Sequence, residues 1–553
     1  MTISIKTFCI KYGWLIWALI VALMVLLFWF AFLSDSGLNS FFSSDALYLP
    51  SLYRDIVQDG YTFNGWTLNP APNFFPDMLL FFILNAIFGD FITATFVFSV
   101  IQYFAIILML YLIFKQVNPN SHLSTFSIAI FLFSSFLFLF FIDKMVWMSM
   151  LLNHNSFHNG AFIISLICIY LFLKYLDIKS WKILVSILLL SILSGASDRL
   201  FFISFSIPVF LVAVVLYFLN KDAKIAIKFI VALITSTIFA IAIWIWFKNN
   251  PYFSLTKAYG ELTLPAIRSS WDIFTGQFYG YLTIPSFILI LTYLSIFSYI
   301  GTVIYILKFF FKLIKEIKHA DKMLVFQLFV LFFTPIVLLA PILSGSYGGF
   351  DTLRYNYFPY LLLPFNAVVL GSNWLNNKKT IRILLNTILL IFMMGFLILN
   401  YPIRELGTGL HRFFTFYPEK AQIIDSYFSD KDLKYGVTNE YWTAKQVTMF
   451  SKKGVRLYRV HALGVPSMHV SNKHWFIDHN KGRHAHCEFA FLLWSKDEEI
   501  PDIFKTLNED INIQPIDLDK WYLYEVKPYR FIMPGTQFRV EPVLIDTSSG
   551  HKQ

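Results

Sequence analysis

The stretch that decides the fold is residues 91–114, FITATFVFSVIQYFAIILMLYLIF, which contains no Asp, Glu, Lys or Arg. A bilayer core about 30 Å thick needs about 20 apolar residues in a helix. This stretch is therefore predicted to cross a membrane. Similar uncharged runs occur at 14–33, 123–142, 157–173, 183–197, 200–220, 229–247, 284–307, 323–343, 355–373 and 383–400. The sequence thus predicts an all-α polytopic membrane domain of about 11 transmembrane helices.

The composition supports a membrane protein and excludes several other classes. Hydrophobic residues make up 57% of the 553-residue chain, and charged residues make up 14%. A soluble domain has about 25% charged residues, which is more than this chain has. A disordered chain has far fewer apolar residues than this chain. Three cysteines exclude a disulfide scaffold. The net charge is +10, but the first 400 residues supply +9 of it (24 basic minus 15 acidic) in short loops, so it does not indicate a nucleic-acid partner.

Basic residues in the loops predict the orientation. With the N-terminus in the cytoplasm, 17 Lys and Arg of the first 400 residues face inward and 7 face outward, which is the expected sign. Eleven of the 15 acidic residues then face outward. Acidic residues contribute little to orientation, so their clustering predicts that the outer face carries the chemistry. The outer segments lack Asn-x-Ser/Thr, which favours a bacterial cytoplasmic (inner) membrane.

The chain is predicted to divide into a membrane domain, 1–400, and a C-terminal extracytoplasmic α/β domain, 401–553. The membrane domain includes a long first outer loop, 34–90, in which the apolar run 78–88 is too short to span and is predicted to lie along the outer leaflet. The tail alternates candidate strands and helices. The predicted strands are 433–438, 455–460, 487–494 and 521–526, and the predicted helices are 418–428, 440–451 and 499–507.

The first outer loop carries an ordered set of motifs. Asp45 and Tyr48 follow the first span, and a predicted helix 51–59 ends at Gly60. A proline-rich turn runs from Pro70 to Pro76, and Phe88-Gly89 precedes the next span. In order and spacing this loop resembles the polyprenyl-phosphate-sugar-dependent glycosyltransferases of the GT-C superfamily. The resemblance covers the first 115 residues closely and the remaining plan loosely.

The resemblance implies that Asp45 is the catalytic residue. Asp45 would accept a proton from the acceptor hydroxyl as a general base. The alternative is a helix N-cap, because Ser43, Ser44 and Asp45 are all good capping residues. Ala46 stands where the family usually has Glu. A single carboxylate is a poor site for a hard cation, so a divalent metal cofactor stays open.

Further substrate-binding residues are predicted on the same face. They are Tyr48, Asp55, His154, His158, Asp198, Arg199, Arg354 and Tyr355. The two histidines would share a face if their segment were helical, and they are otherwise interfacial residues without a ligand. Asp198 and Arg199 form either a salt bridge in a turn or part of a pocket. The resemblance implies that Arg354 meets the lipid phosphate, whose geometry suits its planar fork, and the alternative is snorkelling to the headgroups.

The tail contains six histidines between His461 and His486, including His484-Ala485-His486-Cys487. Their spacing matches no structural zinc pattern. Neither the tail nor the cytoplasmic loops contain a glycine-rich nucleotide-binding fingerprint, which argues against a nucleotide-sugar donor in the cytosol.

The favoured function is an integral membrane glycosyltransferase that moves a sugar from a polyprenyl-phosphate carrier to a glycan, lipid or protein acceptor on the outer face. One alternative is an O-antigen polymerase or ligase, although those enzymes usually place their large soluble part between spans. Another is a transporter or flippase for lipid-linked sugars. Transporters tend to have ionisable residues within spans and internal repeats, and neither is evident here.

Overall fold

The computed structural model describes residues 5–219, 223–250, 253–256, 260–315, 321–428, 434–461, 463–477, 488–506, 516–518, 521–532 and 539–542. Its contacts divide the chain into two compact units. The helical unit comprises Met1–Gly37, Asn73–Ile245 and Ala258–Phe414, and the α/β unit comprises Leu38–Pro72, Trp246–Lys257 and Thr415–Gln553. The predicted domains, 1–400 and 401–553, stay a prediction, and the units are described here by their own bounds.

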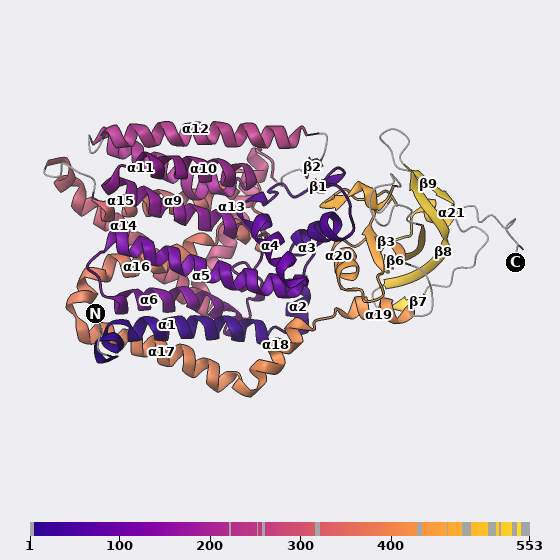
Figure 1. The fold of residues 1–553 in the computed structure, drawn as a ribbon, viewed down its shortest axis with the longest axis horizontal. Helices are drawn as coiled ribbons and strands as arrows, with labels where there is room; N and C mark the ends of the chain where they lie inside the picture. Colours follow the sequence, from indigo (N-terminus) through magenta and orange to yellow (C-terminus); the bar gives the residue numbers. More distant parts are fainter. Residues whose placement is uncertain are drawn as a thin grey trace, which may run out of the picture. The chain divides into compact units, whose positions relative to one another are not determined.

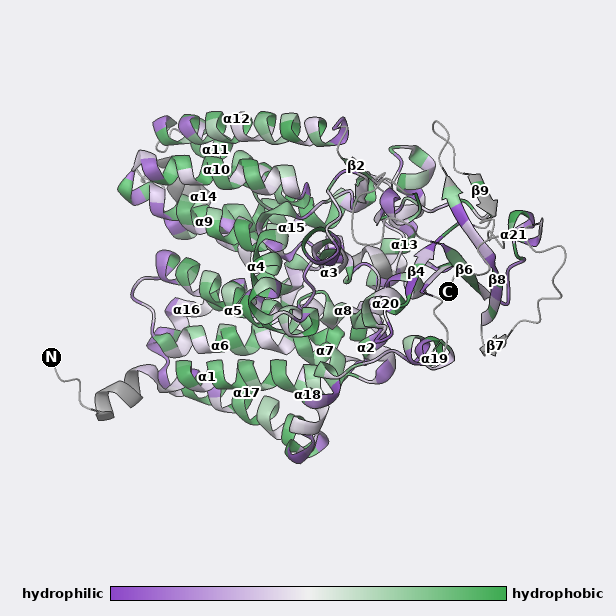
Figure 2. Ribbon diagram, turned by 45° about the vertical axis from the view of Figure 1, so that its right-hand side comes forward, coloured by the Kyte–Doolittle hydropathy of each residue, from purple (hydrophilic) through white to green (hydrophobic). Residues whose placement is uncertain are grey.

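Eight stretches in the described part of the chain are long and apolar enough to cross a membrane. They are Tyr12–Ala31, Phe91–Val117, Leu123–Phe141, Asn159–Ile178, Ala223–Lys248, Phe287–Phe309, Lys322–Leu343 and Lys379–Asn400. They lie in α1 (Ile5–Ala31), α5 (Phe91–Val117), α6 (Leu123–Ser134) with α7 (Phe138–Phe141), α9 (Asn159–Ile178), α12 (Ala223–Lys248), α14 (Phe287–Lys315), α15 (Lys322–Leu343) and α17 (Lys379–Asn400). Figure 2 shows α5 and α12 coloured hydrophobic along most of their length. The chain is a multi-pass integral membrane protein.

The other three predicted spans are also helices. They are α10 (Trp181–Ser197), α11 (Ile207–Phe218) with the π-helical turn before it (Phe202–Ser206), and α16 (Phe358–Asn377). The first two are shorter than the eight spanning stretches. All eleven uncharged runs are therefore helical, which confirms the predicted helical membrane domain. The remaining helices of this unit are α4 (Leu79–Phe88), α8 (Val146–Met150), α13 (Leu264–Thr283) and α18 (Leu406–Phe414), and α2 (Asp35–Phe41) begins in it.

Local sequence explains the joint between α4 and α5. Gly89 ends α4 in the left-handed region with φ of 68°, a conformation that glycine adopts without strain. Asp90 then caps α5, because its carboxylate accepts hydrogen bonds from the amides of Ile92 and Thr93. The apolar run 78–88 is thus helical. Helix α4 ends at Phe88, and α5 begins at Phe91, directly after Gly89 and Asp90.

The α/β unit is built on a six-stranded mixed sheet, in the order β4-β3-β6-β8-β7 with β9 also paired to β8. Its strands are β3 (Tyr435–Thr438), β4 (Arg456–Arg459), β6 (Phe489–Ser495), β7 (Ile516–Leu518), β8 (Trp521–Ile532) and β9 (Arg539–Pro542). β3 pairs in parallel with β4 and β6, and the other pairs are antiparallel. Helices α19 (Glu419–Tyr427), α20 (Tyr441–Phe450) and α21 (Asp502–Thr506) accompany the sheet (Figure 1).

The core of this unit fixes α19 and α20 against the sheet. Ile424, Val447, Leu457, Phe491 and Leu523 are buried together. These residues come from two helices and three strands, so burial of their apolar surface holds the layers together. The predicted alternation of strands and helices in the tail is confirmed within the described residues.

Two segments of the predicted membrane domain complete the α/β unit. The first outer loop supplies α3 (Tyr48–Tyr53), the π-helical segment Arg54–Gln58 and β1 (Trp66–Leu68). β1 pairs in parallel with β2 (Phe253–Leu255) and antiparallel with β5 (Ser471–Asn472). This small sheet joins three stretches that lie far apart in the sequence, and it places Asp45 and Asp55 in the same unit as the C-terminal tail.

Candidate active site

Asp45 lies in the turn between α2 and α3, where the amide of Leu47 donates to the carbonyl of Ser43. The N-cap of α3 is Leu47, and no side chain caps that helix. The N-cap interpretation of Asp45 is therefore wrong. Its partly exposed carboxylate instead accepts a hydrogen bond of 2.8 Å from the hydroxyl of Tyr441, the first residue of α20.

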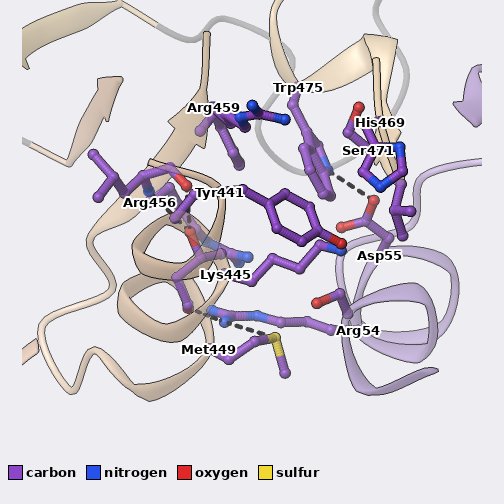
Figure 3. A pocket seen from close by; sticks show the side chains of 16 residues that line it. Arg54, Asp55, Tyr441, Lys445, Met449, Arg456, Arg459, His469, Ser471 and Trp475 are labelled. Atoms are coloured by element: carbon purple, nitrogen blue, oxygen red, sulfur yellow. Dashed lines mark hydrogen bonds between the residues drawn. The ribbon is translucent and has the colours of Figure 1, made fainter. Parts of the chain in front are cut away.

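Cationic side chains surround the phenol that holds Asp45. Lys445 Nζ lies 5.1 Å and Arg459 Cζ 5.5 Å from the centre of the Tyr441 ring, and the His469 ring centre lies 5.3 Å away. Figure 3 shows the Lys445 side chain extending alongside that ring. Burial lowers the pKa of Lys445 to about 7, although the negative charge of Asp45 opposes this shift. Asp45, Tyr441, Lys445, Arg459 and His469 are named here the Asp45 cluster.

Asp55 lies beside this cluster in the same unit. Its Oδ2 accepts a hydrogen bond from Trp475 Nε1 at 2.7 Å (Figure 3). It also accepts one from Asn472 Nδ2 at 3.2 Å. Burial raises the pKa of the Asp55 carboxyl to about 7, more than these hydrogen bonds lower it. A cavity of about 20 Å³, lined by Asp55, Tyr441 and Lys445 among others, leaves room for about one water molecule.

Replacing Asp55 by Asn is expected to remove part of the pH dependence of stability. Because its folded pKa lies above its unfolded value, Asp55 stabilises the fold at low pH, and this contribution is lost as the pH rises through about 7. Between pH 5 and 8 the wild type should lose about 2–3 kcal/mol relative to Asp55→Asn. Thermal unfolding in detergent at both pH values measures this.

The control is Asp502→Asn, which changes a highly exposed carboxylate on α21 of the same unit. It should leave the pH dependence as in the wild type. Parallel curves for the wild type and Asp55→Asn would contradict the expected behaviour of Asp55.

Tyr48 is fully buried, and its hydroxyl donates to the carbonyl of Pro72 at 3.1 Å. The side chain thus ties α3 to the proline-rich turn. Its predicted contact with substrate stays a prediction, and the structure gives this tyrosine a packing role.

In the helical unit, three loops bring together four of the predicted residues. His158 Nδ1 lies 2.6 Å from Asp198 Oδ2, and both side chains are largely buried. The His158 ring centre lies 5.3 Å from that of Tyr355. Arg354 Cζ lies 5.3 Å from the Tyr355 ring centre and 5.6 Å from the Phe157 ring centre.

A buried acid that was not among the predicted site residues adjoins these side chains. Burial and the negative charge of Asp198 together raise the pKa of Asp77 well above its usual range. Asp77, His158, Asp198, Arg354 and Tyr355 are named here the His158 cluster.

Two predicted residues lie elsewhere in the helical unit. His154 packs edge-on against Phe157, with ring centres 4.4 Å apart. The stretch between α8 and α9 is not helical, and His158 has φ of 68°, so the two histidines share no helix face. Arg199 is exposed and lies over the Trp244 ring at 4.9 Å, whereas its neighbour Asp198 pairs with His158.

Gly160, in the first turn of α9, makes room for Asp77. A Cβ on Gly160 would stand 2.2 Å from Asp77 Oδ1. Gly160→Ala is therefore expected to displace the carboxyl and to destabilise the protein by about 1–3 kcal/mol. Thermal unfolding in detergent measures the loss.

Two variants test this explanation. Gly276→Ala, on α13, adds a Cβ that meets no atom within 4 Å, and it should be neutral or slightly stabilising. The double variant Gly160→Ala/Asp77→Ala should recover stability relative to Gly160→Ala. An unfolding temperature of Gly160→Ala equal to that of the wild type would contradict the steric argument.

No group of three or more His, Cys, Asp or Glu side chains in the described part of the chain is arranged to hold a metal ion. The described neighbours of Asp45 in its unit include the Tyr441 phenol, which donates to it, and the cations Lys445 and Arg459. These groups are not the oxygen ligands that a divalent cation prefers. The zinc-like stretch His484–Cys487 lies outside the described residues.

The sequence alone did not predict which residues contact Asp45. Tyr441, Lys445 and Arg459 stand among ordinary aromatic and basic residues of the tail, about 400 positions from Asp45. No spacing or motif marks them. Asp77 was visible only as one of many outer acids.

No known protein family and no curated protein matches the chain in sequence. Solved structures do match it. ArnT from Cupriavidus metallidurans bound to undecaprenyl phosphate matches with 12% identity and a TM-score of 0.44, covering 93% of this chain and 98% of that one. The apo state of the same ArnT matches with 11% identity and a TM-score of 0.46, covering 93% of this chain and 97% of that one. Both matches extend over nearly the whole of this chain.

A second such structure is the apo oligosaccharyltransferase of Archaeoglobus fulgidus. It matches with 12% identity and a TM-score of 0.44, covering 97% of this chain and 75% of that one.

Proposed function

We propose that this chain is an integral membrane glycosyltransferase that moves a sugar from a polyprenyl-phosphate carrier to a glycan, lipid or protein acceptor on the outer face of a bacterial inner membrane. The observation that carries the proposal is the Asp45 carboxylate. It follows directly after the first span, is partly exposed, and is held at Oδ1 by Tyr441. A side chain placed in this way suits proton transfer rather than helix capping.

In this proposal Asp45 is the general base. As the acceptor oxygen attacks C1 of the sugar, its proton passes to the Asp45 carboxylate. The bond from C1 to the carrier phosphate breaks, and the sugar passes through an oxocarbenium-like state, as in glycosidases. Positioning of donor and acceptor supplies much of the remaining rate enhancement.

The leaving phosphate needs positive charge, and the His158 cluster offers it. Arg354 presents a planar fork that matches phosphate oxygens, and Phe157 and Tyr355 support its guanidinium through cation–π contacts. His158, paired with Asp198, adds a second donor that charges when protonated. In this proposal these groups stabilise the carrier phosphate as it leaves.

The deciding experiment offers the purified protein a panel of polyprenyl-phosphate hexoses and pentoses, with a lipid and glycan extract of the source membranes as acceptor. Release of polyprenyl phosphate together with sugar transfer would support the proposal. Uptake of lipid-linked sugar into liposomes without any transfer would instead favour a transporter.

A further inference from the structure

The segment that carries Asp45 is attached to α20 by several hydrogen bonds. Ser44 Oγ donates to the carbonyl of Tyr441 at 2.6 Å, and Lys445 Nζ donates to the carbonyl of Ser44 at 3.3 Å. Gln446 Nε2 donates to the carbonyls of Asn39 at 2.8 Å and Phe42 at 3.0 Å. All of these residues belong to the α/β unit. The backbone around Asp45 is thus shaped by a helix about 400 residues further along the chain.

Tyr441 links this attachment to the carboxylate itself. Its backbone carbonyl receives Ser44, and its hydroxyl donates to Asp45 Oδ1 at 2.8 Å. Its ring is held among Lys445, Arg459 and His469 (Figure 3). The phenol therefore has one orientation, and so has the carboxylate oxygen that it contacts.

The contact suits a general base. The Tyr441 hydroxyl donates to one carboxylate oxygen, Oδ1, and so fixes how the carboxylate is turned. The titratable groups that face this position are Lys445 on α20, Arg459 on β4, His469 in the loop after β4, and Asp55 from the first loop.

We infer that Tyr441 is a positioning residue for the catalytic base: its hydroxyl orients the Asp45 carboxylate toward the reacting groups. This inference rests on the proposed function, in which Asp45 is that base. It assigns to α20 a role in the reaction beyond packing. It also means that the first outer loop, which supplies Asp45, and the tail, which supplies Tyr441, act together in the reaction.

The first test compares the wild type with Tyr441→Phe in the transfer assay. Phenylalanine keeps the ring packing and removes only the hydroxyl. We expect kcat to fall about tenfold while KM for the donor stays unchanged, because the hydroxyl orients the base and does not bind the donor. A merely structural tyrosine would change KM and stability along with kcat. The matched control is Tyr427→Phe, which removes the Tyr427–Glu525 hydrogen bond elsewhere in the same unit and should keep the wild-type kcat.

The second test needs no substrate. In thermal unfolding in detergent, Tyr441→Phe should be no less stable than the matched Tyr427→Phe, so that a fall in kcat reports positioning of Asp45 and not unfolding. A much lower unfolding temperature for Tyr441→Phe than for Tyr427→Phe would show a structural role and overturn the inference.

The outcomes separate the two claims. If Asp45→Asn is inactive and Tyr441→Phe keeps the wild-type kcat, the inference fails and the proposed function stands. If Asp45→Asn transfers sugar at the wild-type rate, the proposed function fails, and the inference that rests on it fails as well.

Discussion

Asp45→Asn is expected to lower sugar transfer by about 10²–10⁴-fold, the usual contribution of a general base. The amide has nearly the same shape as the carboxylate and can still accept the hydrogen bond from Tyr441, so the turn that carries residue 45 should persist. What it loses is the ability to accept a proton from the acceptor hydroxyl. The loss should therefore appear in kcat, with KM for the donor little changed.

The matched control for this variant is Asp35→Asn. Asp35 is an exposed acid in the first turn of α2, ten positions before Asp45 in the same loop, 34–90. Its replacement should leave transfer at the wild-type rate. Wild-type turnover by Asp45→Asn, or a labelling experiment that places residue 45 on the cytoplasmic side, would overturn the proposed mechanism.

Arg354→Ala is expected to lower transfer by about 10²–10³-fold, in the range seen when one donor to a developing negative charge is removed. The guanidinium lies against the Phe157 and Tyr355 rings beside His158, so the variant removes the main fixed cation of the His158 cluster. KM for the polyprenyl-phosphate donor should rise as well, because the same fork binds the ground-state phosphate.

Arg354→Lys separates phosphate recognition from snorkelling to headgroups. Lysine keeps the positive charge and is long enough to reach a headgroup, but it lacks the planar guanidinium that binds two phosphate oxygens at once. Transfer by Arg354→Lys should therefore stay well below that of the wild type. Arg268→Ala, which removes an exposed arginine from α13, should have no effect. Full activity of Arg354→Lys would show that only a positive charge at the membrane surface is needed.

Much of the fold follows from local properties of the sequence. Each of the eleven uncharged runs is a helix, since an apolar segment of this length satisfies its backbone hydrogen bonds only within itself. The strands β3, β4 and β6 agree with the predicted positions within two residues, because their apolar runs are bounded by turn residues. β8 begins where predicted, at Trp521, but extends to Ile532 and not to 526. Gly89 and Asp90 likewise mark the end of one helix and the start of the next.

The candidate site was only partly predictable. Asp45 and Arg354 stood out through the resemblance to the family, together with the place of Asp45 after the first span. Asp198 stood out because it interrupts an apolar stretch, and His158 because it comes just before a span. Their grouping into one cluster was not foreseen, and neither was the pairing of Asp198 with His158 in place of Arg199.

The sequence by itself determined that this protein is a multi-pass membrane protein with an α/β tail, since hydropathy and strand patterns are properties of short segments. The tertiary structure alone decided that residues 38–72 join the tail in one unit and that Tyr441 meets Asp45 across 396 positions. Such contacts depend on how α20 packs on its sheet, and no local pattern encodes that packing.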